Sequence, residues 1–297
     1  MDCEPEMHNR ANLGLITMAY GRQKYVDQAI ALALSVKLHV PHLPICLVTD
    51  RAKPVAPFDS QVRMESFAEA GTVLKTRIYE YSPFEETLFI DSDCLVTRDF
   101  TPQLEAIKAW DFSPVVNTYL RGDDSDLWLE DVGAALFKVG GDCFPKFNGG
   151  VYFFRRSDAA AQVFAEAEAI RHRQSELGIL DFDAAGPGEE TLIGLALAKL
   201  GLTDLYDDNA KLMRTPLNAT GRVHLDILKG ECEFEKNGQI VNPAIVHFCG
   251  PWIDHPAYRI AVEEVASEKR LSAVKRGAIK SAYKAGVLAQ RLANKVS

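Results

Sequence analysis

Residues 13–50 combine two short apolar runs with one helical pattern, and this arrangement limits the chain to an α/β sheet. The segment 13–20, LGLITMAY, is an apolar run of strand length. Residues 25–39 then place apolar side chains at helical spacing, and 45–50, ICLVTD, form a second strand-like run. Because a crossover of this length joins parallel strands, the segment predicts a β-α-β unit that opens a larger sheet.

The same kinds of pattern continue along the chain. Residues 66–84 indicate a loop followed by a helix, and 203–246 indicate short strands and loops. Ser157 is a good N-cap for one further helix, and Gly201 is a good C-terminal stop for another. We therefore predict strands at 86–93, 113–120, 149–156 and 242–248, and helices at 157–175 and 186–201.

Charge and composition exclude several classes of protein. Of 33 basic and 41 acidic residues, eight basic and no acidic ones lie in 269–297, which leaves a net charge of −16 on residues 1–268. A body this acidic lacks the basic footprint of a nucleic-acid binder. The first residues lack the apolar core of a secretory signal, no run is long enough to span a bilayer, and six scattered cysteines predict free thiols in a reducing cytoplasm.

Two carboxylates follow the predicted strand at 86–93. Asp91 and Asp93 come directly after LFI in the sequence TLFIDSDCLV. Ligands of open sheets bind beyond the carboxyl ends of the strands, and hard oxygen ligands suit Mg²⁺ or Mn²⁺. Solvated or capping acids at a strand end are the alternative, because a bare DxD is common by chance.

Four motifs in the same order resemble the glycosyltransferases of the GT-A fold, and within them the retaining, glycogenin-like family 8. They are ITMAYGRQKYV at 16–26, FIDSDCLV at 89–96, FNGGVYFF at 147–154 and HFCGPW at 247–252. The resemblance implies a Rossmann-like mixed sheet flanked by helices, as a single domain. We divide the chain into a tail (1–12), the transferase domain (13–262) and a basic amphipathic C-terminal helical segment (263–297).

The resemblance implies that Asp91, Asp93 and His247 bind the metal, with Mn²⁺ favoured over Mg²⁺ because an imidazole nitrogen joins the oxygens. It also implies a donor site in which Tyr20 or Tyr25 stacks on uracil, Asn148 contacts sugar hydroxyls, and Lys75 or Arg77 contacts the diphosphate. The full predicted donor site is Thr17, Ala19, Tyr20, Tyr25, Asp50, Lys75, Arg77, Ser92, Asn148, Gly149, Gly150 and Gly250.

Two departures from the family pattern concern the reaction centre. Glu189 and Glu190 stand where the family has an Asp-Gln pair, so they become the predicted catalytic residues, together with Asp183 and with Asp181 as an alternative. A carboxylate there permits a covalent step or base catalysis, whereas simple capping of a helix N-terminus is the competing interpretation.

The motif HFCGPW lacks the lysine that precedes Pro-Trp in the family and contacts the diphosphate. Arg259 or Lys75 is expected to replace it.

The basic segment 269–297 has helical periodicity. Its basic residues gather opposite an alanine-rich apolar side, which is typical of helices that bind membrane surfaces. Packing against the acidic body or a second subunit is the alternative. The apolar side comprises Leu271, Val274, Ala278, Ala282, Ala285, Leu288, Leu292 and Val296.

The sequence therefore predicts a cytoplasmic hexosyltransferase, peripheral on the inner face of a membrane. It would move a sugar from a nucleoside-diphosphate sugar, UDP-hexose above all, to a glycan or lipid-linked acceptor, with retention. A homodimer is compatible with the sequence. The competing interpretations are a nucleotidyltransferase of similar fold, although the first loop has only one glycine, and a non-catalytic binder of nucleotide-sugars or glycans.

Overall fold

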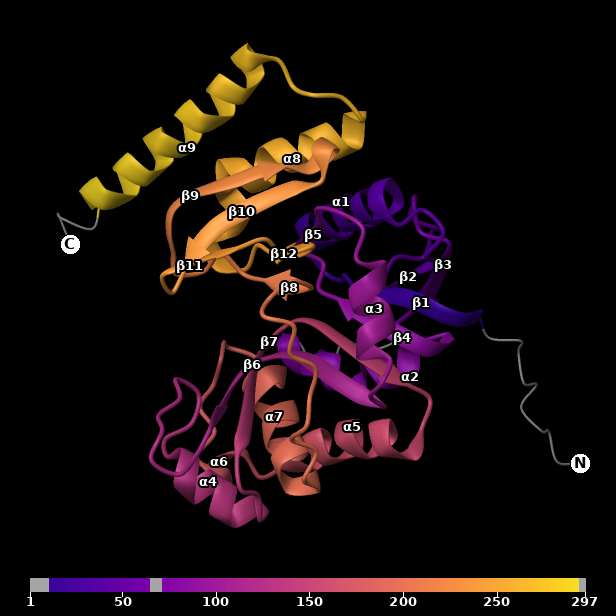
Figure 1. Cartoon of the computed structure of the whole chain (residues 1–297), viewed down its shortest axis with the longest axis vertical. Helices are drawn as coiled ribbons and strands as arrows, with labels where there is room; N and C mark the ends of the chain where they lie inside the picture. Colours follow the sequence, from indigo (N-terminus) through magenta and orange to yellow (C-terminus); the bar gives the residue numbers. More distant parts are fainter. Residues whose placement is uncertain (1–10, 65–70, 294–297) are drawn as a thin grey trace, which may run out of the picture. The chain divides into compact units, whose positions relative to one another are not determined.

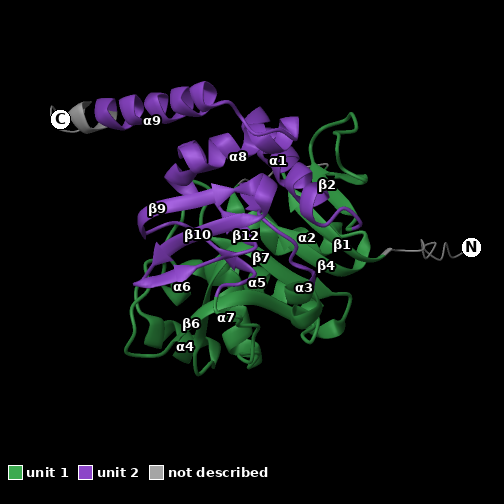
Figure 2. Cartoon of the chain, turned by 45° about the horizontal axis from the view of Figure 1, so that its top comes forward, with its two compact units in different colours: residues 1–21, 43–91, 102–209 green, residues 22–42, 92–101, 210–297 purple. Residues whose placement is uncertain are grey.

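The computed structural model describes residues 11–64 and 71–293 (Figure 1). The chain forms two compact units, each built from separate segments of the sequence (Figure 2). Unit 1 comprises residues 1–21, 43–91 and 102–209, and unit 2 comprises 22–42, 92–101 and 210–297.

Unit 1 contains a six-stranded mixed sheet in the order β3-β2-β1-β4-β7-β6. The strands β3, β2, β1 and β4 are mutually parallel, whereas β7 is antiparallel to both β4 and β6. This arrangement confirms the predicted mixed sheet flanked by helices. The strands are β1 (Ala11–Met18), β2 (Ile45–Thr49), β3 (Ser60–Arg63), β4 (Phe84–Ile90), β6 (Phe112–Leu120) and β7 (Phe144–Arg155).

The helices of unit 1 begin and end where local chemistry favours it. The Ser157 side chain accepts a hydrogen bond from the N–H of Ala160 at the start of α5, and Gly201 ends α7 in the left-handed region, both as predicted. The helices are η1 (Thr72–Arg77), α2 (Ile78–Tyr81), α3 (Thr101–Ile107, with Thr101 itself in unit 2), α4 (Val132–Val139), α5 (Asp158–Arg171), α6 (Gln174–Leu177) and α7 (Glu189–Leu200).

Aromatic side chains fill the core of unit 1. The rings of Phe89 and Tyr152, which face each other across β4 and β7, stack with their centroids 4.5 Å apart. Phe112, Phe154 and Phe164 pack beside them. The aromatic run VYFF that predicts a strand is therefore fully buried, and its pairing with β4 places the preceding Asn-Gly-Gly beside the end of that strand.

Unit 2 contains two small sheets, with strand orders β11-β10-β9 and β5-β12-β8. Helix α1 packs on β5, where the Ser35 hydroxyl accepts a hydrogen bond from the N–H of Val96 at 3.0 Å. Its elements are α1 (Gln23–His39), β5 (Cys94–Val96), β8 (Met213–Arg214), β9 (Ala219–Asp226), η2 (Ile227–Lys229), β10 (Glu231–Lys236), β11 (Gln239–Val241), β12 (Ile245–His247), η3 (Gly250–Asp254), α8 (Pro256–Ser267) and α9 (Ala273–Ala293).

The C-terminal part of unit 2 is helical, as the basic amphipathic pattern predicts. Helix α8 runs across the domain boundary predicted between residues 262 and 263, and the predicted division into domains stays a prediction. In the part of the chain that the structure describes, no helix combines the length and apolarity needed to cross a bilayer.

Candidate functional site

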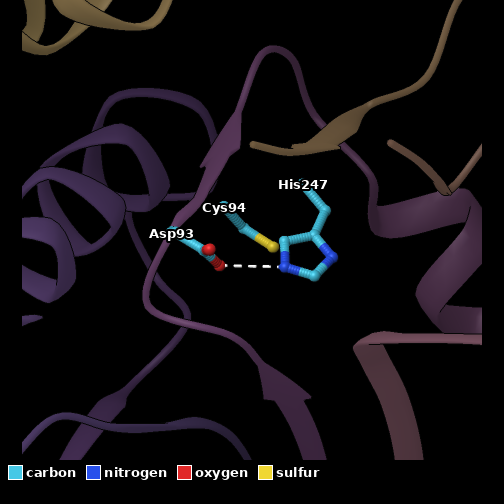
Figure 3. Close-up of side chains that lie close together, drawn as sticks. All are labelled: Asp93, Cys94 and His247. Atoms are coloured by element: carbon cyan, nitrogen blue, oxygen red, sulfur yellow. Dashed lines mark ion pairs between the residues drawn. The ribbon is translucent and has the colours of Figure 1, made fainter. Parts of the chain in front are cut away.

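A potential metal site lies in unit 2, where strands β5 and β12 pair. Cys94 and His247 face each other in this antiparallel pair, so their side chains lie on the same side of the sheet. Asp93 precedes Cys94, and its Oδ1 lies 2.9 Å from Nε2 of His247 (Figure 3). One ligand atom from each of the three residues falls within 4.8 Å of the others. The strand pairing thus brings His247 to Asp93 and Cys94, although 154 positions separate Asp93 from His247.

The chemistry of these three groups suits a transition-metal ion. A carboxylate oxygen and an imidazole nitrogen are good ligands for Mn²⁺, and the Cys94 thiol adds a soft donor that Zn²⁺ also accepts. His247 and Cys94 are buried, which limits competition from water. Two of the predicted ligands, Asp93 and His247, therefore lie together. Cys94, predicted only as a free thiol, is an additional member.

Asp91, the third predicted ligand, belongs to a buried charge cluster in unit 1. Its Oδ2 lies 2.6 Å from Nζ of Lys75, which also donates to Oε1 of Glu189 at 2.8 Å. Burial opposes the charge of Lys75, but the two carboxylates more than offset it, so its pKa is raised well above the ordinary value. The ammonium group thus holds the end of β4 and the start of α7 together and places a cation directly at Asp91.

Glu190 is anchored to the Asn-Gly-Gly segment of β7. Its Oε1 accepts a hydrogen bond of 2.6 Å from the N–H of Gly149 and lies 3.4 Å from Nδ2 of Asn148. Burial and the neighbouring Glu189 raise the pKa of Glu190, against the effect of the Gly149 N–H. A Cβ at Gly149 would lie 2.3 Å from Oε1 of Glu189, so any larger residue there would displace that carboxylate. Asn148, Gly149, Glu189 and Glu190 are thus one packed group.

The loops after β1 and β2 meet at the carboxyl edge of the sheet. The Tyr20 hydroxyl donates to the carbonyl of Gly71 at 2.9 Å. Asp50 accepts from the N–H of Gly21 at 3.2 Å, which is the loop-capping role expected of acids after strands. Thr17 and Ala19 are buried at the end of β1 and beyond it.

The other predicted site residues are more scattered. In unit 1, Arg77 forms an exposed ion pair with Glu80, and Asp183 is exposed and accepts from the N–H of Ala185 at 2.7 Å. The Asp181 carboxylate accepts a hydrogen bond from the side-chain amide of Gln174. The carbonyl of Gly150 accepts from the N–H of Asp91 at 2.9 Å. In unit 2, Ser92 is buried, whereas Tyr25 and Gly250 are exposed. Their roles in donor binding stay predictions.

Sequence reasoning missed Cys94 and two cations near the HFCGPW motif, Arg214 and Lys236. Cys94 and Arg214 depend on strand pairings between distant segments, β5 with β12 and β12 with β8, whereas Lys236, on β10, reaches the carbonyl of Thr215 through its side chain. A local signal existed for Lys236 alone, because it continues the buried side of an alternating strand pattern, ECEFEK.

Comparison with known proteins identifies the fold. The chain is similar to two structures of LgtC, and each alignment covers 89% of this chain and 99% of LgtC at 17% identity. One is an active-site glutamine-to-glutamate mutant, with a TM-score of 0.55. The other is the galactosyltransferase LgtC in complex with donor and acceptor sugar analogues, with a TM-score of 0.54.

A weaker similarity relates the chain to the glycosyltransferase GlyE of Streptococcus pneumoniae, with a TM-score of 0.43, 14% identity, and coverage of 68% of this chain and 46% of GlyE. No protein-family model and no curated protein sequence matches the chain. The LgtC similarity shows that the chain has the GT-A-like fold of a glycosyltransferase structure.

Proposed function

We propose that the protein is a metal-dependent glycosyltransferase that moves a hexose from a nucleoside-diphosphate sugar, UDP-hexose above all, to a glycan or lipid-linked acceptor, with retention of configuration. The fold shared with LgtC, which was crystallised with donor and acceptor sugar analogues, supports this class of reaction. The four motifs of the sequence support the assignment to a family 8-like enzyme.

The observation that carries the proposal is the convergence of Asp93 and His247. Two residues that the DxD and HFCGPW motifs predict as ligands lie 2.9 Å apart although 154 positions separate them. Asp91 would join them, and Mn²⁺ is the metal that this combination of oxygen and nitrogen ligands favours over Mg²⁺. When bound, the metal would neutralise the charge that develops on the diphosphate leaving group.

The protein groups of unit 1 would position the sugar. Glu189 is fixed by Lys75, and from its buried position at the start of α7 it would keep Lys75 and Glu190 in place around the sugar. Glu190 takes the place that the resemblance gives to a glutamine, and it holds Gly149 and Asn148 in place. Asp183, in the exposed loop before α7, would contact the acceptor side.

Donor turnover tests this function directly. The protein is incubated with Mn²⁺ and UDP-, GDP-, CMP- and dTDP-sugars, and the released products are separated by chromatography. We expect Mn²⁺-dependent release of UDP, which Asp93→Asn abolishes and which Glu190→Gln retains in part. Release of a sugar 1-phosphate in place of UDP would indicate the nucleotidyltransferase, because transfer of the nucleotidyl group breaks the bond between the two phosphates. Binding of a donor by the wild-type protein without any turnover would indicate the non-catalytic binder.

We also propose that α9 attaches the enzyme to the cytoplasmic face of a membrane. One side of α9 packs on α8, where Arg276 donates to the buried Glu264 at 2.7 Å and the Tyr283 ring lies near His255. Val274 and Leu288, on the predicted apolar side, are 83% and 60% exposed. A helix that is held by one side and exposes apolar residues on the other can lie flat on a bilayer.

Co-sedimentation with vesicles that contain anionic lipid tests this attachment. Val274→Glu with Leu288→Glu should abolish sedimentation at low salt, while a surface change elsewhere, Lys53→Glu, should leave it unchanged. Equal sedimentation of wild type and the double variant would refute the attachment. If the wild type is a dimer and the double variant is a monomer, α9 pairs two subunits instead.

A further inference from the structure

Two loops of unit 1 expose apolar side chains next to the start of α7. The first loop, 121–131, carries Leu127 and Trp128, and the second, 178–188, carries Phe182. Leu127 is 81% exposed, Phe182 is 46% exposed and Trp128 is half-buried. Single apolar residues are normal on a protein surface, but a contiguous group with a polar rim marks a binding surface.

Backbone hydrogen bonds hold the two loops together. The N–H of Leu180 donates to the carbonyl of Trp128 at 3.0 Å, and the N–H of Glu130 donates to the carbonyl of Gly178 at 2.9 Å. Leu129, between the two bonded positions of the first loop, is buried in the core of unit 1. The side chains of these loops are therefore presented from a fixed backbone, and a ligand need not order the loops in order to bind.

Trp128 and Phe182 form an aromatic platform on these loops. Their rings meet edge to face, with centroids 5.0 Å apart and planes inclined by 61°. Both residues remain partly exposed. The C–H groups on the face of a pyranose ring are weakly positive and pack well on the negative face of an aromatic ring. The platform is therefore suited to a sugar.

The platform lies directly beside the predicted catalytic pair. Gly188 is the N-cap of α7, and the helix begins with Glu189 and Glu190. A Cβ at Gly188 would lie 3.4 Å from Cβ and Cγ of Phe182, which is van der Waals contact. Phe182 thus packs against the residue that precedes the pair, so a sugar on the platform would lie next to the reaction centre.

A second connection to the catalytic pair runs through Lys146 on β7. Asp126 accepts a hydrogen bond of 2.9 Å from the N–H of Trp128, and its Oδ2 lies 2.6 Å from Nζ of Lys146. Burial raises the pKa of Glu190, and the charge of Lys146 is one of the influences that oppose this rise. Trp128 and Glu190 therefore lie on opposite sides of one lysine.

Carboxylates flank the Phe182 ring. Asp181 and Asp183 precede and follow it, and both are exposed. Asp181 accepts from Gln174 and Asp183 accepts from the N–H of Ala185, each at 2.7 Å. Since a carboxylate can accept about four hydrogen bonds, both have capacity for sugar hydroxyls. Their negative charges also repel a phosphate or carboxylate group on a ligand.

We propose that Trp128 and Phe182 bind the acceptor sugar of the transfer, a neutral pyranose that stacks on the rings and donates hydroxyl hydrogen bonds to Asp181 and Asp183. The inference rests on the glycosyltransferase function proposed above and narrows its acceptor to an uncharged end of a glycan. The flanking acids favour such a sugar over an anionic lipid headgroup, because the sugar supplies hydroxyl donors and carries no charge to be repelled.

Transfer kinetics with simple glycosides test the inference. The acceptors are the methyl pyranosides of glucose, galactose, mannose and N-acetylglucosamine, with Mn²⁺ and the donor identified by turnover. Phe182→Ala should raise KM for the accepted glycoside about three- to tenfold and change kcat less, because the contact between ring and sugar is lost. Phe182→Trp keeps an aromatic ring and should retain most of the affinity. Phe137→Ala removes an 88% exposed ring from α4 and should leave KM unchanged.

Phe182→Leu distinguishes a sugar from a lipid on the same surface. Leucine keeps an apolar side chain but has no aromatic face, so KM for the glycoside should rise as it does in Phe182→Ala. A KM for Phe182→Leu equal to that of the wild type would overturn the inference. So would co-sedimentation of the wild type with phosphatidylcholine vesicles that Phe182→Ala abolishes, because the surface would then bind lipid.

The preference for an uncharged sugar gives an independent readout. Saturation-transfer NMR should show that the wild type binds methyl glucoside more tightly than methyl glucuronide. Asp181→Asn with Asp183→Asn should narrow this difference, since the repulsion of the glucuronide carboxylate is removed. An unchanged difference in the double variant would contradict the assigned role of the two acids.

The outcomes separate this inference from the function on which it rests. If the wild type turns over a donor but neither uses nor binds any of the glycosides, the inference fails and the function stands. If the wild type turns over no donor, the proposed function fails and NMR binding alone decides. Loss of glycoside binding in Phe182→Ala would then keep the platform as a glycan site. Circular dichroism verifies folding, and if Phe182→Ala does not fold, Phe182→Leu and the acid variants decide.

Discussion

Replacing Lys75 by methionine should destabilise the protein strongly. The change removes an ammonium group that lies within 2.8 Å of both Asp91 and Glu189. Glu189 has only 3% of its side chain exposed, so water cannot replace the lost partner. Breaking a buried ion pair by removal of one member costs about 3–5 kcal/mol. With about 2 °C per kcal/mol for a chain of this size, the melting temperature should fall by roughly 6–10 °C.

A thermal melt in EDTA measures the effect, and Arg77→Met serves as the matched control. Arg77 lies two residues away and forms an exposed ion pair with Glu80, so its loss should cost no more than about 0.5 kcal/mol. The double variant Lys75→Met with Glu189→Met should lose less stability than the two single variants lose together, because it no longer buries the Glu189 carboxylate without its lysine.

Two results would refute this reasoning. The first is a melting temperature for Lys75→Met that matches that of Arg77→Met, because the cluster would then contribute nothing. The second concerns the metal. Mn²⁺ should stabilise Lys75→Met more than it stabilises the wild type, since the lysine no longer competes for Asp91. Equal stabilisation of both proteins would remove Asp91 from the set of ligands.

Three further predictions concern single positions. Gly149→Ala should cost about 2 kcal/mol and weaken donor binding, because its Cβ would displace Glu189, whereas Gly286→Ala, which meets open space, should be neutral or stabilising in thermal melts. Cys94→Ser should weaken binding of Zn²⁺ at least tenfold in competition titrations and leave Mn²⁺ binding nearly unchanged, because only Zn²⁺ favours the thiol. Asp131→Ala removes the N-cap of α4 and should lower the free energy of unfolding by about 1 kcal/mol in urea.

Local patterns were sufficient to predict most of the strands and helices around the site. The apolar run before Asp91 is β4, and the aromatic run after Asn148 is part of β7. Helix ends were predictable from single residues, because a cap depends on residues within one turn. The Ser157 hydroxyl caps the start of α5, and the left-handed backbone of Gly201 ends α7. Helices α4 and α8 were not predicted individually, although Asp131 and Pro256 are ordinary start signals.

Local sequence patterns could not predict which charged side chains contact one another. The sequence placed Lys75 upstream of the DxD acids, but its pairing with Glu189 depends on how η1 packs on α7. Lys236 contacts the residue after Arg214 only because the strands of unit 2 come together from distant segments. A spacing rule describes residues within one element, whereas both of these contacts are set by tertiary packing.

The division of unit 2 into three separate segments has a consequence for how the protein is made. Unit 1 is complete once residue 209 has been synthesised, but α1 and β5 belong with residues that begin at Ala210. At about 5–20 residues per second, α1 leaves the ribosome roughly 10–30 s before those residues appear. The side of α1 that packs on α8 must stay uncovered until then, so the second half of unit 2 ends its exposure to chaperones and to other nascent chains.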